Sequence, residues 1–193
     1  MENNWNENKI KKTSAENKLE LEELDRYHEA GHSVLCVLDG EIITRITIDP
    51  VGGSSIDTDF KLEELQYDEY FSNEDTRSQI NRKIQTYYAG YYSEYGYLLA
   101  KGHEIDFNHF YTRKILDSNF SLKSTDFDFI RGILNKITGD EKNQNMIREE
   151  QKTNAKNFVK KYWKIIQKTA ESLLETNDPV EIMKIINEHA ADK

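Results

Sequence analysis

The first regular apolar pattern along the chain begins near Leu19 and predicts a buried helix that ends at Asp39-Gly40. Its positions recur at steps of three and four residues, the spacing of one helix face: Leu21, Leu24, Tyr27, His28, Gly31, Val34, Leu35 and Leu38. Residues 1–18 are rich in Asn, Glu and Lys and have no periodic apolar positions. Such a segment buries too little apolar surface to become ordered, so we expect a flexible N-terminal arm over residues 1–18.

A change of period after this helix predicts a short β-sheet. Side chains alternate over residues 43–49, with Thr44, Ile46 and Ile48 on one face of the expected strand. The strand should stop at Pro50, because proline and the glycines that follow it favour turns. The acidic, irregular residues 54–71 are interpreted as the return strand of a hairpin followed by a loop.

Helical spacing returns in the rest of the chain. A second helix is expected from the pair Ser72 and Asp75 to about Leu99, since these two residues are typical of a helix N-terminus. A third should cover residues 124–137, and residues 143–193 should form C-terminal helices. One small sheet among many helices predicts a mainly helical α+β fold with a C-terminal helical bundle, as a single domain over residues 19–193.

Composition and charge exclude several classes of protein. The chain of 193 residues has 37% hydrophobic and 32% charged residues, and no apolar run approaches the roughly 20 residues that cross a bilayer. Its net charge of −9 argues against a nucleic-acid partner, and the lysines between residues 152 and 168 are interpreted as the solvent-facing side of a helix. The N-terminus lacks the pattern of a secretory signal, and one cysteine cannot form an internal disulfide framework. We therefore expect a cytoplasmic protein without a membrane span.

The sequence His28-Glu29-Ala30-Gly31-His32 lies inside the first predicted helix and predicts a metal site. Four residues advance an α-helix by about 400°, so both imidazoles lie on one face, one turn apart. Neutral imidazole is a good ligand for Zn²⁺, and a neighbouring carboxylate can take a proton from zinc-activated water. This spacing on a helix is typical of zinc metallopeptidases. It predicts His28 and His32 as ligands and Glu29 as general base.

Two imidazoles leave such a site incomplete, because a catalytic zinc usually has three protein ligands and a water. Asp126, at the start of the third predicted helix, is a candidate ligand, although a carboxylate there could equally cap the helix. Asp128 competes with it. Glu94 could ligate the metal or could accept a hydrogen bond from an imidazole N–H. Spacing alone leaves these alternatives open.

A family resemblance selects among them. The segment YHEAGHSV at residues 27–34 resembles the YHEAGHAL motif in the peptidase domain of the FtsH family, the membrane-linked AAA+ zinc proteases. Three later segments are similar to family landmarks in the same order: ITRITIDPVGG (43–53) to a strand and turn, AGYYSE (89–94) to AGRAAE, and STDF (124–127) to SNDL. The resemblance covers roughly residues 19–189. It implies that Asp126 is the third zinc ligand and that Glu94 supports the ligands.

The resemblance implies a zinc-dependent endopeptidase that hydrolyses peptides or unfolded, flexible protein segments. Glu29 would take the proton of the attacking water and pass it to the leaving amine. The strand with Thr44, Ile46 and Ile48 is expected to pair with an extended substrate. A separate ATPase partner and a homo-oligomer are further expectations by analogy. The alternatives are a catalytically inactive, zinc-stabilised binding or regulatory module and a protease dedicated to one partner.

The chain also departs from the family pattern. It has no counterpart of the ATPase module or the membrane anchors, and Tyr91 stands at the position of the arginine in AGRAAE. The stretch between Glu94 and Asp126 is longer than in the family, which implies an insertion at about residues 97–123. His103 and His109 lie in this insertion, where we favour surface or capping roles over metal binding.

Overall fold

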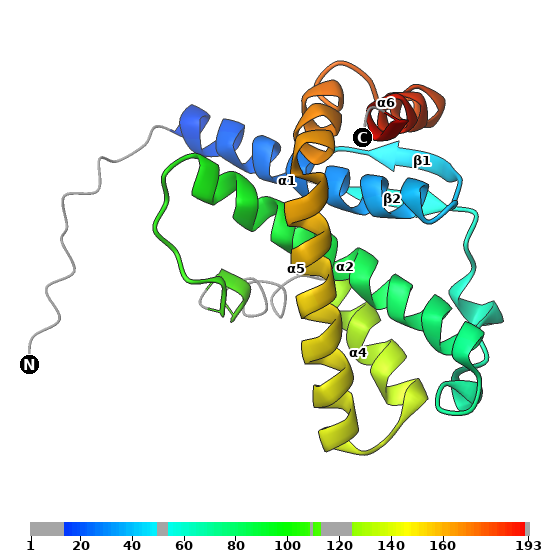
Figure 1. Ribbon diagram of the computed structural model, residues 1–193. Coiled ribbons are helices and arrows are strands. Elements are labelled where there is room, and N and C mark those ends of the chain that lie inside the picture. The colour runs from blue at the N-terminus through cyan, green and yellow to red at the C-terminus, as the bar shows by residue number, and fades with distance from the viewer. Residues whose placement is uncertain (1–13, 50–53, 109, 113–124, 192–193) are drawn as a thin grey trace, which may run out of the picture.

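Helices and one small sheet make up the structure, which confirms the predicted mainly helical α+β class. The computed structural model describes residues 14–49, 54–108, 110–112 and 125–191. In chain order the elements are α1 (Ser14–Leu38), β1 (Ile43–Thr47), β2 (Ser55–Thr58), the 3₁₀ helices η1 (Leu62–Glu64) and η2 (Tyr67–Glu69), α2 (Glu74–Ala100), α4 (Asp126–Ile137), α5 (Glu141–Ser172) and α6 (Pro179–Ala191) (Figure 1). Residues 107–108 and 110–112 are also helical.

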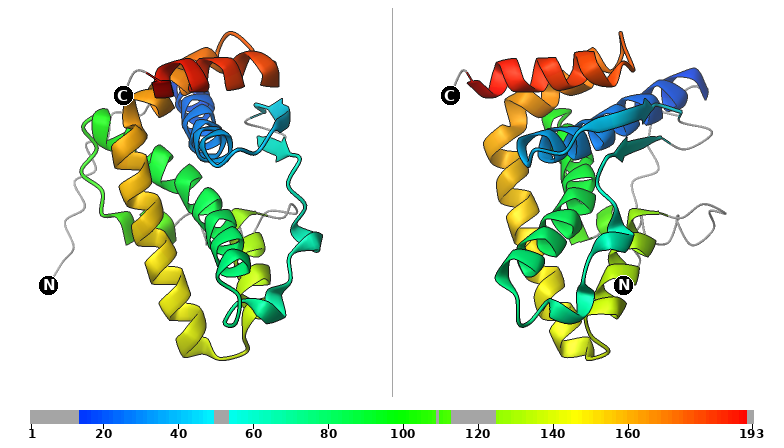
Figure 2. Two further views of the ribbon diagram at one scale, coloured as in Figure 1. Left: turned by 45° about the vertical axis from the view of Figure 1, so that its right-hand side comes forward. Right: turned by 90° about the vertical axis from the view of Figure 1, so that its right-hand side faces the viewer.

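Three long helices, α1, α2 and α5, pack against one another around the main core, with α5 crossing the other two (Figures 1 and 2). Helix α4 packs against α2, and α6 packs against α5, α1 and β1. Fully buried side chains from these helices include Val34, Ile80, Ile84, Tyr88, Leu134, Ile147, Ile166, Ile182 and Ile186. Each such aliphatic side chain contributes roughly 1.5–3 kcal/mol through burial, so the core fixes α1, α2 and α4 relative to one another.

The two strands form the predicted antiparallel hairpin, but with an irregular register. Ile46 lies opposite Ile56 and Thr47 opposite Ser55, and the register shifts between Ile43 and Arg45. Because of this shift, Ile43 and Ile46 are both buried, while Thr44 is exposed. The strict alternation expected from the sequence is therefore wrong, since a bulge adds a residue and rotates the side chains beyond it.

Two helix starts differ from the expected positions. Helix α1 already begins at Ser14, within the arm expected over residues 1–18, since Ala, Glu and Lys favour a helix even without an apolar stripe. Residues 1–13 lie outside the described residues. The N-cap of α2 is Asn73 rather than Ser72, because the Asn73 side chain accepts from the backbone N–H groups of Asp75 and Thr76. An asparagine in this place satisfies two N–H groups that the helix leaves unpaired.

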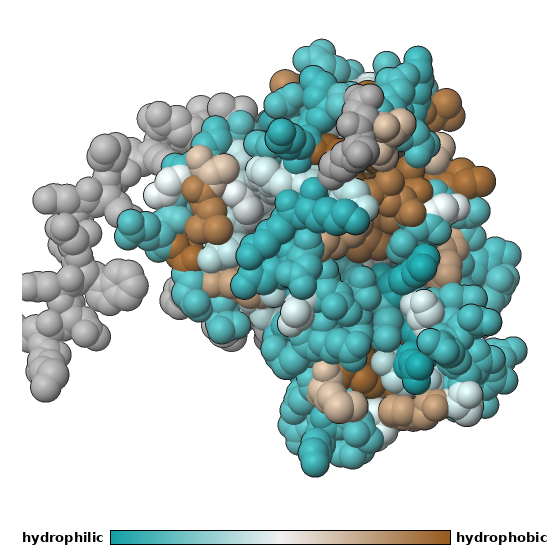
Figure 3. Space-filling model, in the orientation of Figure 1, coloured by the Kyte–Doolittle hydropathy of each residue, from teal (hydrophilic) through white to brown (hydrophobic). Residues whose placement is uncertain are grey.

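The lysines between residues 152 and 168 lie on α5, where Lys156, Lys160, Lys161, Lys164 and Lys168 are exposed. In the view of Figure 3, the surface over α5 is mainly hydrophilic. These five lysines agree with the interpretation as the solvent-facing side of a helix, whereas the Lys152 side chain is only 15% exposed. Within the described ranges, no helix has an apolar stretch long enough to cross a membrane.

Helices α1 and α2 approach each other closely at Gly31. A Cβ atom at this position would lie 2.4 Å from Ser93 Oγ and 2.5 Å from the Ala89 carbonyl oxygen. The Ser93 hydroxyl donates to that same oxygen at 2.7 Å. Because a backbone carbonyl in a packed helix cannot move aside, only glycine fits here.

We predict that Gly31→Ala lowers the free energy of unfolding by about 1–3 kcal/mol, because the added methyl group would push the two helices apart. Gly132→Ala is the control, since a Cβ at Gly132 in α4 would meet no atom within 4 Å. It should raise stability by roughly 0.5–1 kcal/mol, because alanine favours a helix more than glycine does. Urea unfolding in the presence of a chelator measures both. An unchanged Gly31→Ala midpoint would contradict the close crossing.

Candidate metal centre

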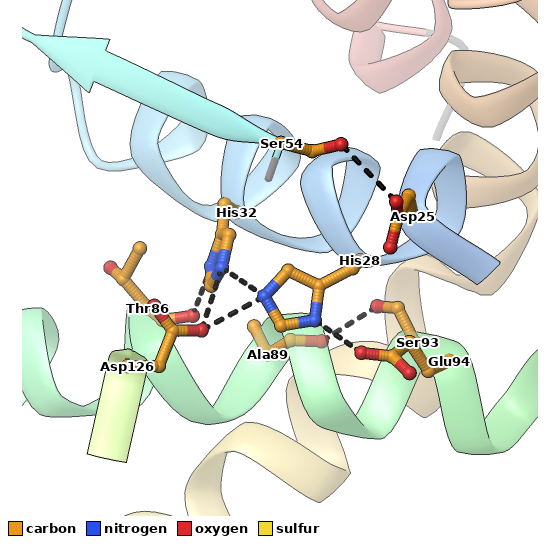
Figure 4. Close-up of polar contacts among 9 residues, drawn as sticks. All are labelled: Asp25, His28, His32, Ser54, Thr86, Ala89, Ser93, Glu94 and Asp126. Carbon is orange, nitrogen blue, oxygen red and sulfur yellow. Dashed lines mark hydrogen bonds and ion pairs between the residues drawn. The ribbon is translucent and has the colours of Figure 1, made fainter. Parts of the chain in front are cut away.

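The imidazoles of His28 and His32 project from adjacent turns of α1 toward α2, as their four-residue spacing predicts (Figure 4). Their Nε2 atoms are 2.8 Å apart, and their rings are nearly perpendicular, with centroids 4.5 Å apart. Gly90 of α2 makes room for both rings: a Cβ there would lie 2.6 Å from His32 Cε1 and 2.8 Å from His28 Cε1. The small residues Ala89 and Gly90 predict from the sequence that another element can approach closely here, and the two imidazoles of α1 occupy that space.

Asp126, the first residue of α4, brings a carboxylate to the same point (Figure 4). Its Oδ2 atom lies 2.8 Å from His28 Nε2 and 3.1 Å from His32 Nε2. One ligand atom from each of the three residues falls within 4.8 Å of the others, so this group could hold a metal ion. The fold thus joins the two histidines of α1 to a carboxylate from a distant part of the chain.

The other two candidate carboxylates have different positions. Asp128 is at the N-terminus of α4, where its Oδ2 accepts from the backbone N–H and the hydroxyl of Thr125, at 3.0 and 3.1 Å. Its Oδ1 accepts from Arg131 at 2.7 Å. Glu94 is only 2% exposed, and its Oε1 lies 2.5 Å from His28 Nδ1. Asp128 therefore caps the helix, while Glu94 orients an imidazole.

The hydrogen bonds at the Nδ1 atoms determine what the Nε2 atoms can do. His32 Nδ1 lies 2.7 Å from the Thr86 carbonyl oxygen, which can only accept, so Nδ1 carries the proton. The same holds for His28 Nδ1 against the carboxylate of Glu94. In neutral rings both Nε2 atoms then present lone pairs to each other and to Asp126 Oδ2. Three electron-pair donors that meet in this way require a cation or a proton between them.

The pKa values of the centre reflect this arrangement. Burial lowers the pKa of His28, but the hydrogen bonds and negative charges of Asp126 and Glu94 outweigh it and raise that pKa well above its usual value. Burial raises the pKa of Asp126, but the charge of His32 and the hydrogen bonds from both imidazoles outweigh it and hold the carboxyl well below its usual pKa. Without a metal, a proton therefore occupies the centre.

Glu29 lies beside the centre on α1 and is only 4% exposed. Burial raises the pKa of its carboxyl to about 7, against the opposing influence of His32 and His28. Among the described residues, none provides a hydrogen bond to its buried Oε2 atom. A carboxyl group in this setting is suited to exchange a proton near neutral pH.

The three residues expected to bind substrate do not share one surface. Thr44 is exposed, and its hydroxyl donates to the Asp57 carbonyl oxygen at 3.2 Å, whereas Ile46 is buried in the core. Ile48 lines a surface hollow of about 290 Å³ between α1 and the end of α5. The strand next to the metal-binding part of α1 in Figure 4 adjoins Ser54 and is β2. A substrate-binding role for Thr44, Ile46 and Ile48 therefore stays a prediction, with β2 as the alternative strand.

The described part of the expected insertion contributes aromatic packing. Phe107 stacks on Tyr92 at 4.0 Å between ring centroids, and Tyr111 contacts Tyr91 at 5.6 Å. Tyr91 in turn stands edge-on to His28, with centroids 5.2 Å apart. His103 lies in the turn after α2, where its backbone N–H donates to the carbonyl of Leu98, while His109 lies outside the described residues.

Comparisons of the chain with protein-family models, with curated proteins and with solved structures found no match. The resemblance to the FtsH-family peptidase domain therefore stays a prediction. The function of the chain has to be inferred from the geometry of the centre.

We predict that Asp126→Asn weakens metal binding by about 10-fold or more, because an amide cannot supply the charge of the ligating carboxylate. Asp128→Asn is the matched control. It should lower stability by roughly 0.3–1 kcal/mol, because an amide lacks the negative charge that is favourable at a helix N-terminus, but leave metal affinity nearly unchanged. Titration with Zn²⁺ and thermal unfolding separate the two effects. The reverse order of metal affinities would move the third ligand to Asp128.

We further predict that metal affinity rises with pH. The raised pKa of His28 means that the metal-free protein holds a proton which the metal must displace. Below that pKa, affinity should increase by about tenfold per pH unit for each proton displaced. Calorimetric titration in buffers of different ionisation enthalpy counts these protons. Zinc binding with no proton release at pH 7 would contradict the proposed state of the centre.

Proposed function

We propose that this chain is a zinc-dependent endopeptidase that acts on peptides or flexible protein segments. The observation that carries the proposal is the convergence of His28 Nε2, His32 Nε2 and Asp126 Oδ2, beside the buried carboxyl of Glu29. Two imidazoles and a carboxylate form a donor set typical of catalytic zinc, which keeps its fourth position for water.

The dimensions and supporting contacts are consistent with zinc. Zinc ligands at about 2.0–2.2 Å in a tetrahedral arrangement lie roughly 3.3 Å from one another. The three donor atoms are separated by 2.8–3.1 Å, so small side-chain movements would suffice. Zinc-binding imidazoles usually donate their second N–H to a carboxylate or a backbone carbonyl. Glu94 and the Thr86 carbonyl accept these hydrogen bonds here.

Each polar group has a role in the proposed hydrolysis. Zinc supplies a Lewis acid that polarises a carbonyl and acidifies a neighbouring water. Glu29 accepts a proton from the attacking water and delivers it to the amide nitrogen as the C–O bond forms and the C–N bond breaks. Glu94 and the Thr86 carbonyl accept the second imidazole N–H groups, so that both Nε2 atoms stay directed at the position of the metal.

An extended substrate would pair with β2 rather than with β1. One edge of β1 is paired with β2, and α6 packs against β1, where the Ile43 backbone N–H lies 3.3 Å from Met183 Sδ. Strand β2 packs against α1, the helix that carries both histidines (Figure 4), and strand addition supplies backbone hydrogen bonds without sequence preference. A folded substrate would need a separate ATPase to unfold it first.

We predict that Glu29→Gln retains zinc and fold but reduces cleavage by about 10²–10⁴-fold, because proton transfer is lost. The assay should offer a disordered polypeptide and quenched peptides, with and without a chelator. Glu22→Gln is the control on the same helix, since Glu22 lines the hollow beside Ile48, and it should keep full activity. If the zinc-loaded wild type cleaves none of these flexible substrates, the chain is instead an inactive, zinc-stabilised binding module.

A further inference from the structure

An aromatic pair, Tyr87 of α2 and Phe129 of α4, adjoins the metal centre. Phe129 follows Asp126 by three residues on α4, which brings both side chains to the same side of that helix. The rings of Tyr87 and Phe129 are stacked, with centroids 5.4 Å apart and an interplanar angle of 4°. The Tyr87 ring also stands edge-on to His32, at 6.4 Å between centroids. The pair therefore adjoins two of the three proposed ligands, since Tyr87 contacts His32 and Phe129 lies on the same side of α4 as Asp126.

The pair differs from the other aromatic residues around the centre in its exposure. Tyr91 and Tyr111 are buried, and Phe127 is packed against both of them. Phe129 is 41% exposed, and Tyr87 is half-buried beneath it. A large ring that is held flat yet exposed beside a reactive centre offers apolar surface to a ligand rather than filling the core.

The surroundings of Tyr87 favour an apolar occupant. Both rings are uncharged, and the neighbouring carboxylate of Asp126 is already engaged by the imidazoles of His28 and His32. An acidic substrate side chain placed on the pair would lose hydration, and the negative faces of the two rings would not attract it. An aromatic or large aliphatic side chain would gain stacking or dispersion contacts instead.

We propose that Tyr87 and Phe129 form a specificity subsite that binds a large apolar side chain, aromatic above all, of the substrate residue next to the scissile bond. This inference rests on the proposed peptidase function and names the substrate class of that site. It assigns the stacked pair a role in selecting where the chain is cut, with the zinc-binding residues and Glu29 carrying out the cut itself.

The test uses quenched peptides that are identical except for one residue on either side of the cleaved bond, which is Phe, Leu, Ala or Glu. Wild-type protein should prefer Phe and Leu over Ala and Glu. Phe129→Ala should lower kcat/KM for the Phe peptide by about tenfold and change that for the Ala peptide little, since only the contact with the Phe129 ring is lost. Phe129→Leu should keep the preference for Leu. Leu174→Ala, which removes an exposed apolar side chain at the end of α5, should change no ratio.

Binding provides a readout independent of turnover. Zinc-loaded Glu29→Gln should bind the Phe peptide more tightly than the Ala peptide, and adding Phe129→Ala should remove the difference. Zinc content and unfolding midpoint check that the variants are intact. If the wild type cleaves no peptide but the binding preference for Phe is still present, the peptidase function is refuted and the subsite is not. Cleavage without a preference for apolar residues, or an equal loss on every peptide in Phe129→Ala, would overturn the subsite.

Discussion

Three electron-pair donors meet at one point between α1, α2 and α4, and the packing of these helices holds them there. His28 Nε2, His32 Nε2 and Asp126 Oδ2 lie 2.8–3.1 Å apart. In the neutral rings the proton is on Nδ1, where Glu94 and the Thr86 carbonyl accept it, so neither Nε2 atom carries a proton. Such a group is stable only around a cation or a shared proton. The close crossing of α1 and α2 brings the rings over Gly90, and the packing of α4 on α2 brings the carboxylate.

The pairing of the two histidines could be predicted from the sequence, because helical geometry alone fixes their relative positions. The four-residue spacing of His28 and His32 places both on one face, whatever the helix packs against. The third ligand depends on how α4 meets α2, a long-range property that left Asp126, Asp128 and Glu94 as alternatives until a family resemblance chose among them. The observed contacts separate their roles: a carboxylate in the centre, a helix cap and a partner for an imidazole.

Other features could not be predicted fully from the residue types. The Thr86 carbonyl that orients His32 belongs to the backbone, so its residue type does not reveal it. The alternation over residues 43–49 indicated a strand correctly but placed Thr44 and Ile46 on the same face. The register shift between Ile43 and Arg45 reverses the face on which the side chains after it lie. The stacking of Tyr87 on Phe129 also joins two helices that only the tertiary structure brings together.

Zinc-edge anomalous diffraction from crystals of the zinc-loaded protein would locate the ion and its ligands in one experiment. We expect one strong peak at about 2.0–2.2 Å from His28 Nε2, His32 Nε2 and an oxygen of Asp126, with a water in the remaining position next to Glu29. A zinc ion bound elsewhere, with the two imidazoles still joined to Asp126 by a proton, would contradict the proposed metal centre.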